Sequence, residues 1–288
     1  DIYVCNTIYK DSLRRRNILY VNEGADAAGI PHFKDMASAY GLDIHVQSTL
    51  GSFFDYDNDG DLDMYLTVNE ASNDNMNRFG KTAVQHSAGR LYRNDWDSAV
   101  SHAVFKDVSV QAGITLDGFG HAATIADLNL DGWKDIYISD DFLSNNILYI
   151  NNHNGTFTNQ ARNYFKHTSY NSMGQDIIDI NNDGLADVVE LDMNPEDNYR
   201  KKMMLSPNNY NTFQNFDRYN YQYQYVRNTL QLNQGPALLE NDSIGAPVFS
   251  EIGFMSGMSQ TDWSWTPLIT DFDNDGYRDM IITNGFPK

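Results

Sequence analysis

The sequence predicts an all-β protein built from repeated units of four antiparallel strands. Three observations lead to this expectation. A nine-residue, aspartate-rich loop occurs four times, a short apolar strand follows each copy, and two further strand patterns recur behind that strand. Sequence that recurs in a fixed order indicates a repeated structural unit, and such an array counts as one domain whatever its length.

The four loops share one pattern, with Asp or Asn at positions 1, 3 and 5, glycine at position 6 and aspartate at position 9. They comprise residues 55–63 (loop one), 127–135 (loop two), 179–187 (loop three) and 271–279 (loop four). Oxygen ligands at alternate positions, followed by a glycine that can adopt positive φ, wrap a hard cation such as calcium. We expect the ligands to be the side chains at positions 1, 3, 5 and 9 and the backbone carbonyl at position 7.

The predicted metal-site residues are Asp55, Asp57, Asp59, Asp61 and Asp63 in loop one; Asp127, Asn129, Asp131, Trp133 and Asp135 in loop two; Asp179, Asn181, Asp183, Leu185 and Asp187 in loop three; and Asp271, Asp273, Asp275, Tyr277 and Asp279 in loop four. Asp61 adds a fifth carboxylate to loop one. Loops two and three have Asn at position 3, so they are expected to bind calcium more weakly than loops one and four. The sequence therefore predicts about four structural Ca2+ ions.

Two other structures are compatible with part of this loop pattern. An EF-hand needs an acid at position 12 and flanking helices, but position 12 is Leu66, Ile138, Glu190 or Ile282 and the flanks are strand-like. A turn rich in Asp and Asn can also form without a metal. Calcium is favoured over magnesium because many carboxylates suit a flexible oxygen shell, and no His or Cys lies in the loops to favour a transition metal.

The remaining strands follow each loop in a fixed order. The second strand begins at position 9 of the loop, and the opening residues Asp1-Ile-Tyr-Val match it, so Asp1 is expected to be the ninth residue of a preceding loop in a longer protein. The third strand has Leu at its third position and Asn at its sixth, where a turn is expected to begin, and the fourth begins at Phe. The third strands are residues 17–22, 89–94, 146–151 and 228–233, and the fourth begin at Phe33, Phe105, Phe157 and Phe249.

Four antiparallel strands per repeated unit are typical of a β-propeller blade. Whole blades are expected at 47–110, 119–162 and 172–252, with partial blades at 1–36 and 263–288. The third blade carries an insertion at about 192–227. We expect a fragment of a larger propeller of about seven blades, open as an arc with exposed edges and completed by the remaining blades of a parent chain.

Composition limits the possible partners. The formal net charge is −19, and fifteen aspartates lie in the four loops, so an acidic surface argues against nucleic-acid binding, which needs clustered Lys and Arg. No run of residues is long and apolar enough to insert into a membrane. The single Cys5 excludes an internal disulfide. Loops of the extracellular type bind calcium weakly, which favours a location outside the cytosol.

With the Asn-x-Leu-Tyr-x-Asn strand behind each loop, the sequence resembles FG-GAP/VCBS repeats, the units of integrin-α-like β-propellers. Residues 192–204 and 261–265 further resemble the ASPIC/UnbV, cartilage-acidic-protein-like group of bacterial proteins. This resemblance implies a calcium-stabilised propeller on the bacterial cell surface or associated with the outer membrane. The implied function is a non-catalytic binding or adhesion module whose partner is a protein or a glycan.

The insertion is the candidate for a specific ligand surface, because it is rich in tyrosine. An exposed aromatic platform would suit sugar rings or a protein partner, whereas the same rings packed over the sheets would be structural. The tyrosines are Tyr199, Tyr210, Tyr219, Tyr221, Tyr223 and Tyr225. No catalytic residues are predicted, since the seven histidines have no repeated partner. The alternative is a domain of a carbohydrate-active enzyme, resembling the propellers of polysaccharide lyases.

Overall fold

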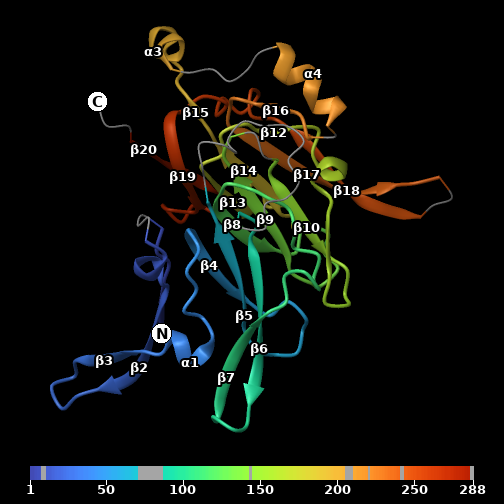
Figure 1. Ribbon diagram of the computed structural model, residues 1–288. Helices are drawn as coiled ribbons and strands as arrows, with labels where there is room; N and C mark the ends of the chain where they lie inside the picture. The colour runs from blue at the N-terminus through green and yellow to red at the C-terminus, as the bar shows by residue number, and fades with distance from the viewer. Residues whose placement is uncertain are drawn as a thin grey trace.

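Figure 1 shows the computed structural model of the protein, which describes residues 1–7, 11–70, 87–142, 145–204, 210–219, 221–240 and 243–285. The expected all-β class is confirmed, because antiparallel sheets of three and four strands are the main regular structure of this part of the chain. Within each four-stranded sheet neighbouring strands follow one another in sequence order, and in one of these sheets an insertion separates the second strand from the third.

In the described part of the chain, five antiparallel sheets follow one another. Sheet 1 contains β1 (Ile2–Val4), β2 (Ile18–Ala25) and β3 (Pro31–Asp35); sheet 2 contains β4 (Ser48–Phe54), β5 (Asp63–Val68), β6 (Arg90–Asp97) and β7 (His102–Asp107); sheet 3 contains β8 (Gly120–Ala126), β9 (Asp135–Asp140), β10 (Ile147–Asn151) and β11 (Phe157–Asn159). Sheet 4 contains β13 (Gly174–Ile178), β14 (Asp187–Leu191), β17 (Thr229–Leu238) and β18 (Ile244–Glu251); sheet 5 contains β15 (Met193–Asn194), β19 (Asp262–Thr270) and β20 (Asp279–Asn284).

A separate apolar core fills each gap between successive sheets. The largest lies between sheets 2 and 3, where Phe54, Tyr65 and Leu91 pack against Ile136 and Tyr149. The first strands of sheets 2 to 5 contact one another in order, β4 with β8, β8 with β13 and β13 with β19. The second strands β5, β9 and β14 are buried throughout, which explains why each contains a short run of consecutive apolar residues rather than an alternating pattern.

In sheets 3 and 4 the first Asn of the third-strand pattern joins the start of the third strand to the end of the second strand. The backbone N–H of Asp140 donates to Asn146 Oδ1 over 3.0 Å, and the N–H of Asp192 donates to Asn228 Oδ1 over 2.7 Å. Both asparagines are buried, so the side-chain oxygen satisfies a backbone donor that would otherwise lose water without compensation. The first Asn of the pattern therefore stabilises the pairing of the second and third strands.

Short helical turns follow the fourth strands, including α1 (Ala37–Tyr40) after β3 and α2 (Ala161–Tyr164) after β11. Helix α1 ends at Gly41, whose φ is 74°, and a Cβ there would lie 2.7 Å from the Phe105 carbonyl oxygen. Phe165 stands in the equivalent position after α2 and has an extended backbone with φ −108°. The loss of glycine in that copy therefore accompanies a different path of the chain.

The insertion in sheet 4 forms β15, two helices and β16 (Gln224–Tyr225). Helices α3 (Asn198–Met203) and α4 (Tyr210–Arg218) lie at the same end of the molecule, at the top of Figure 1. Strand β16 pairs in parallel with β12 (Thr168–Ser169), a pairing that the sequence did not predict. Within the described ranges no helix has the length and apolar character needed to cross a membrane, and one 3-10 turn, η1 (Ser12–Arg15), completes the helical elements.

Candidate metal centre

All four aspartate-rich loops occupy the same place in their sheets, between the first and second strands. The residue before each loop pairs with position 9, as Phe54 does with Asp63 and Ala126 with Asp135. Two residues in each loop adopt positive φ. Glycine at position 6 has φ between 87° and 95°, and position 4 has φ between 58° and 60°. Asn58, Asn182 and Asn274 suit position 4, whereas Leu130 does not.

The carboxylate at position 1 organises each turn by accepting backbone N–H groups. Asp55 accepts from the N–H of Asp59 over 3.2 Å and from that of Gly60 over 3.0 Å, and the same pair of bonds recurs at Asp127, Asp179 and Asp271. The carboxylate at position 5 accepts the N–H of position 7. These shared bonds give the four loops one conformation.

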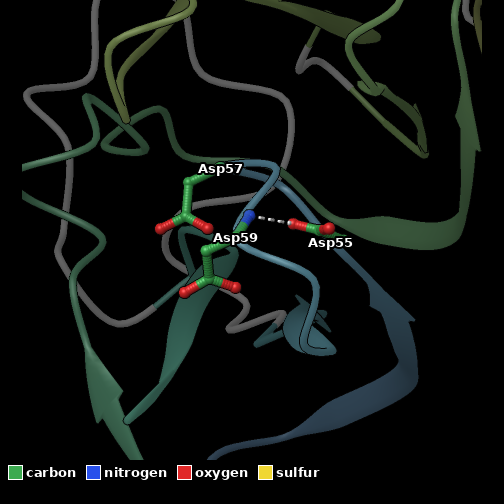
Figure 2. Close-up of side chains that lie close together, drawn as sticks. All are labelled: Asp55, Asp57 and Asp59. Carbon is green, nitrogen blue, oxygen red and sulfur yellow. Dashed lines mark hydrogen bonds between the residues drawn. The ribbon is translucent and has the colours of Figure 1, made fainter.

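Loops one and four each bring three carboxylates together. Asp55, Asp57 and Asp59 present oxygen atoms that all lie within 4.8 Å of one another (Figure 2), and so do Asp271, Asp273 and Asp275. In loop one, Asp57 Oδ1 is buried without a hydrogen-bond partner, as is Asp61 Oδ1. Clustered oxygen ligands with unsatisfied atoms fit a calcium ion, which takes six to eight oxygens.

The raised pKa values of two carboxyl groups in loop one also fit a cation site. Burial, together with the nearby charges of Asp59 and Asp55, raises the pKa of Asp57. Burial and the same acidic neighbours raise the pKa of Asp61. A bound divalent cation would reverse this repulsion, because it favours the ionised form of each carboxylate.

Loops two and three are arranged differently at position 3. Asn129 donates from Nδ2 to Asp131 Oδ2 over 2.7 Å, and Asn181 donates to Asp183 over 2.9 Å. The amide at position 3 thus donates a hydrogen bond to the carboxylate at position 5, whereas in loop one the position-3 side chain is itself a carboxylate. Each of these loops holds one negative charge fewer among positions 1, 3 and 5, in keeping with the prediction of weaker calcium binding.

The aspartate at position 9 is turned toward the backbone of its own sheet. Asp63 accepts from the N–H of Tyr56 over 3.2 Å and from that of Asn94 over 2.8 Å. Asp135 and Asp187 make the same two bonds with equivalent residues. Burial raises the pKa of Asp63 and of Asp135 to about 7, although these hydrogen bonds oppose the shift. Position 9 therefore fastens the loop to the third strand, a role that the sequence did not suggest.

Asp1 makes the same contact. Its carboxylate accepts the N–H of Asn22 over 2.7 Å, and Asn22 is the last residue of the third-strand pattern in sheet 1. In loop four, Asp279 is exposed and accepts the N–H of Phe272 over 3.1 Å. Asp1 thus occupies the place of a ninth loop residue.

The last Asn of the third-strand pattern also connects each loop to the next sheet. Asn151, in sheet 3, donates from Nδ2 to the backbone oxygen of Tyr56 in loop one over 2.8 Å. Asn233, in sheet 4, donates to the backbone oxygen of Leu128 in loop two over 3.5 Å. The sequence predicts turns at these asparagines but does not predict this contact, although their recurrence at a fixed position signals a shared role. An ordered loop consequently holds the neighbouring sheet.

Position 7 differs most between the loops. Trp133 stacks on His153 with ring centroids 5.0 Å apart, Tyr277 is largely exposed and Leu185 is half-buried. In loop two the N–H of Trp133 donates to Asp131 Oδ1 over 2.9 Å. Outside loop one, the side chain at position 7 is not a carboxylate and is therefore free to make contacts other than metal binding.

The six tyrosines of the insertion do not form one continuous platform. Tyr199 lies on α3, while Tyr210 is on α4 and Tyr219 follows it, and all three are exposed. Tyr221 and Tyr223 pack against Phe216 and Tyr170 in a small core. Tyr225 lies in β16, beneath the guanidinium of Arg227. The structure thus divides the predicted ligand surface into an exposed part and a packed part.

Comparison with known proteins identifies one segment of the chain. Residues 127–190 match the FG-GAP-like repeat. This FG-GAP-like segment begins with loop two and contains loop three and most of sheet 3. No curated protein matches the chain. A solved structure of an Agrocybe aegerita lectin, titled as specific for non-reducing terminal N-acetylglucosamine, aligns over 93% of this chain and 68% of its own, with 15% identity and a TM-score of 0.32.

Proposed function

We propose that the chain is part of a calcium-stabilised β-propeller that serves as a non-catalytic binding module. The observation that carries this proposal is the common conformation of the four loops, two of which cluster three carboxylates within 4.8 Å. Four successive sheets that contact through their first strands, with a core in each gap, support the propeller arrangement.

The role of calcium follows from the contacts of the loops. Loops one, two and three are each joined to their own third strand through position 9, and loops one and two are also joined to the next sheet through Asn151 and Asn233. An ion that neutralises the clustered carboxylates would stabilise these contacts, because it binds the folded loop and not the unfolded chain. Calcium would therefore fix the sheets relative to one another.

The partner and location belong to the same proposal. Sites of this type need the high calcium concentration found outside the cytosol, which supports an extracellular or cell-surface position. The partner would be a glycan or a protein at that surface. Membership of the integrin-α-like propellers and of the ASPIC/UnbV, cartilage-acidic-protein-like group is proposed on the loop motif and on residues 192–204 and 261–265.

Thermal unfolding with and without calcium tests this proposal. We expect EDTA to lower the melting temperature, calcium to restore it, and native mass spectrometry to show up to about four bound ions. Asp273→Asn gives loop four the ligand set of loops two and three, so it should weaken calcium binding at that loop without disturbing its backbone bonds. Equal melting temperatures in EDTA and in millimolar calcium would show that the loops are turns that need no metal. Polysaccharide digestion with release of unsaturated products would contradict the non-catalytic assignment.

A further inference from the structure

A hollow of about 540 Å3 opens between sheets 2 and 3, beside loops one and two. This volume lies within the range of small-molecule sites, about 300–1,000 Å3. The residues that matter here are Tyr56 and Asp57 of loop one, Trp133 of loop two, Arg93, Gln111 and His153. The hollow is distinct from the four metal loops and from the insertion, because residues outside both contribute to its lining. The structure describes all of its lining residues.

The hollow exists because of specific substitutions between repeated units. Seven residues after the Phe of the fourth strand, the chain has Tyr40 in the first copy, Ala112 in the second and Tyr164 in the third. Tyr164 is buried and belongs to the core of the next gap, together with Ile150. The counterpart of Ile150 in the gap with the hollow is Arg93. Where the next gap is filled by apolar side chains, the gap between sheets 2 and 3 therefore leaves a hollow beside its apolar core.

The walls of the hollow are held rigidly. The Trp133 indole stacks on the His153 ring at an interplanar angle of 15°, and His153 Nε2 lies 2.8 Å from Asp131 Oδ2. Arg93 makes two hydrogen bonds with Asp95, over 2.7 and 3.2 Å. Both basic side chains are thus already paired with carboxylates, so the hollow offers no uncompensated positive charge for an anionic ligand. Asp95 takes two of the five N–H donors of the guanidinium.

We propose that this hollow binds a neutral sugar ring. The flat, apolar face of a pyranose would pack on Trp133, while its hydroxyl groups would hydrogen-bond with Arg93 and Gln111. Acidic sugars are disfavoured because Asp57 lines the same hollow. This inference rests on the proposed binding function and assigns it a place between loops one and two.

Three variants test the assignment. Ala112→Tyr fills the hollow with the side chain that the neighbouring gaps carry, so it is expected to fold and to abolish sugar binding. Trp133→Ala removes the stacking surface and should weaken binding at least tenfold. Trp96→Ala is the matched control, because Trp96 is 70% exposed on β6 and does not line the hollow.

The calcium-loaded protein would first be tested on an array of neutral and acidic glycans, and each variant then titrated with the best neutral binder and with methyl hexopyranosides. Melting temperatures in calcium and in EDTA would be recorded on the same samples. The proposal is supported if Trp133→Ala loses the binding of neutral glycans and Trp96→Ala retains it. This result holds even if Ala112→Tyr fails to fold. Binding unaffected by Trp133→Ala, binding of acidic glycans alone, or no glycan binding overturns it. Calcium-dependent melting in those samples would leave the proposed calcium role standing.

Discussion

Exchanging Asp57 for Asn should make the metal-free protein more stable and the calcium-loaded protein less so. Asp57 lies within 4.8 Å of both Asp55 and Asp59. At that separation each pair of unit charges repels by about 1 kcal/mol in water and about 3.5 kcal/mol at an effective dielectric constant of 20. Because these side chains are partly exposed, we expect a gain of about 1–3 kcal/mol in EDTA.

Urea unfolding in EDTA and in saturating calcium measures both effects. In calcium, Asp57→Asn should lose the stabilisation that loop one contributes, and calorimetry should show one strong site fewer. Glu23→Gln is the control, since it removes one negative charge from an exposed position on β2. Lower stability of Asp57→Asn in EDTA, or an undiminished gain from calcium, would refute the electrostatic reasoning.

Loop two offers the opposite exchange. Asn129→Asp replaces the amide that donates to Asp131 with a third carboxylate, which reproduces the ligand set of loop four. We expect lower stability in EDTA and tighter calcium binding in this variant. Both exchanges should therefore change sign between the two conditions, which a general effect on folding would not produce.

Three further predictions concern individual residues. Leu130→Asn should raise the free energy of unfolding by about 0.5–1 kcal/mol in urea titrations, because φ is 58° there, and Asn58→Leu should lower it similarly. Asn151→Ala, which removes buried bonds to two backbone oxygens, should cost about 2–4 kcal/mol in the same assay and clearly more than Asn94→Ala; equal costs would contradict the contact between sheets. Burial raises the pKa of Asp192 to about 7, so the folded state keeps a proton that the unfolded state, with an ordinary pKa of 3.8, releases. Stability should then fall as pH rises from about 4 to 7, by up to about 1.4 kcal/mol per pH unit, and Asp192→Asn in saturating calcium should lose that part of the slope.

The sequence alone determined the repeated unit and the place of every loop within it. Positions 1, 5 and 6 carry side chains or conformations that act within a few residues of the chain, so Asp55 and Gly60 could be interpreted directly. The strands were predictable for a similar reason, since burial on both faces leaves a short apolar run such as that of β5. Local chemistry of this kind needs no knowledge of distant neighbours.

Contacts between segments far apart in the chain were decided only by the tertiary structure. Asn151 was expected at a turn, yet its side chain reaches loop one, 95 residues earlier. The hollow beside Trp133 depends on the size of Ala112, which has meaning only when the two sheets face each other. The six tyrosines formed one pattern in sequence and two environments in space. Packing depends on which side chains face one another and on the directions in which they point. The order of residues does not show either of these for segments far apart in the chain.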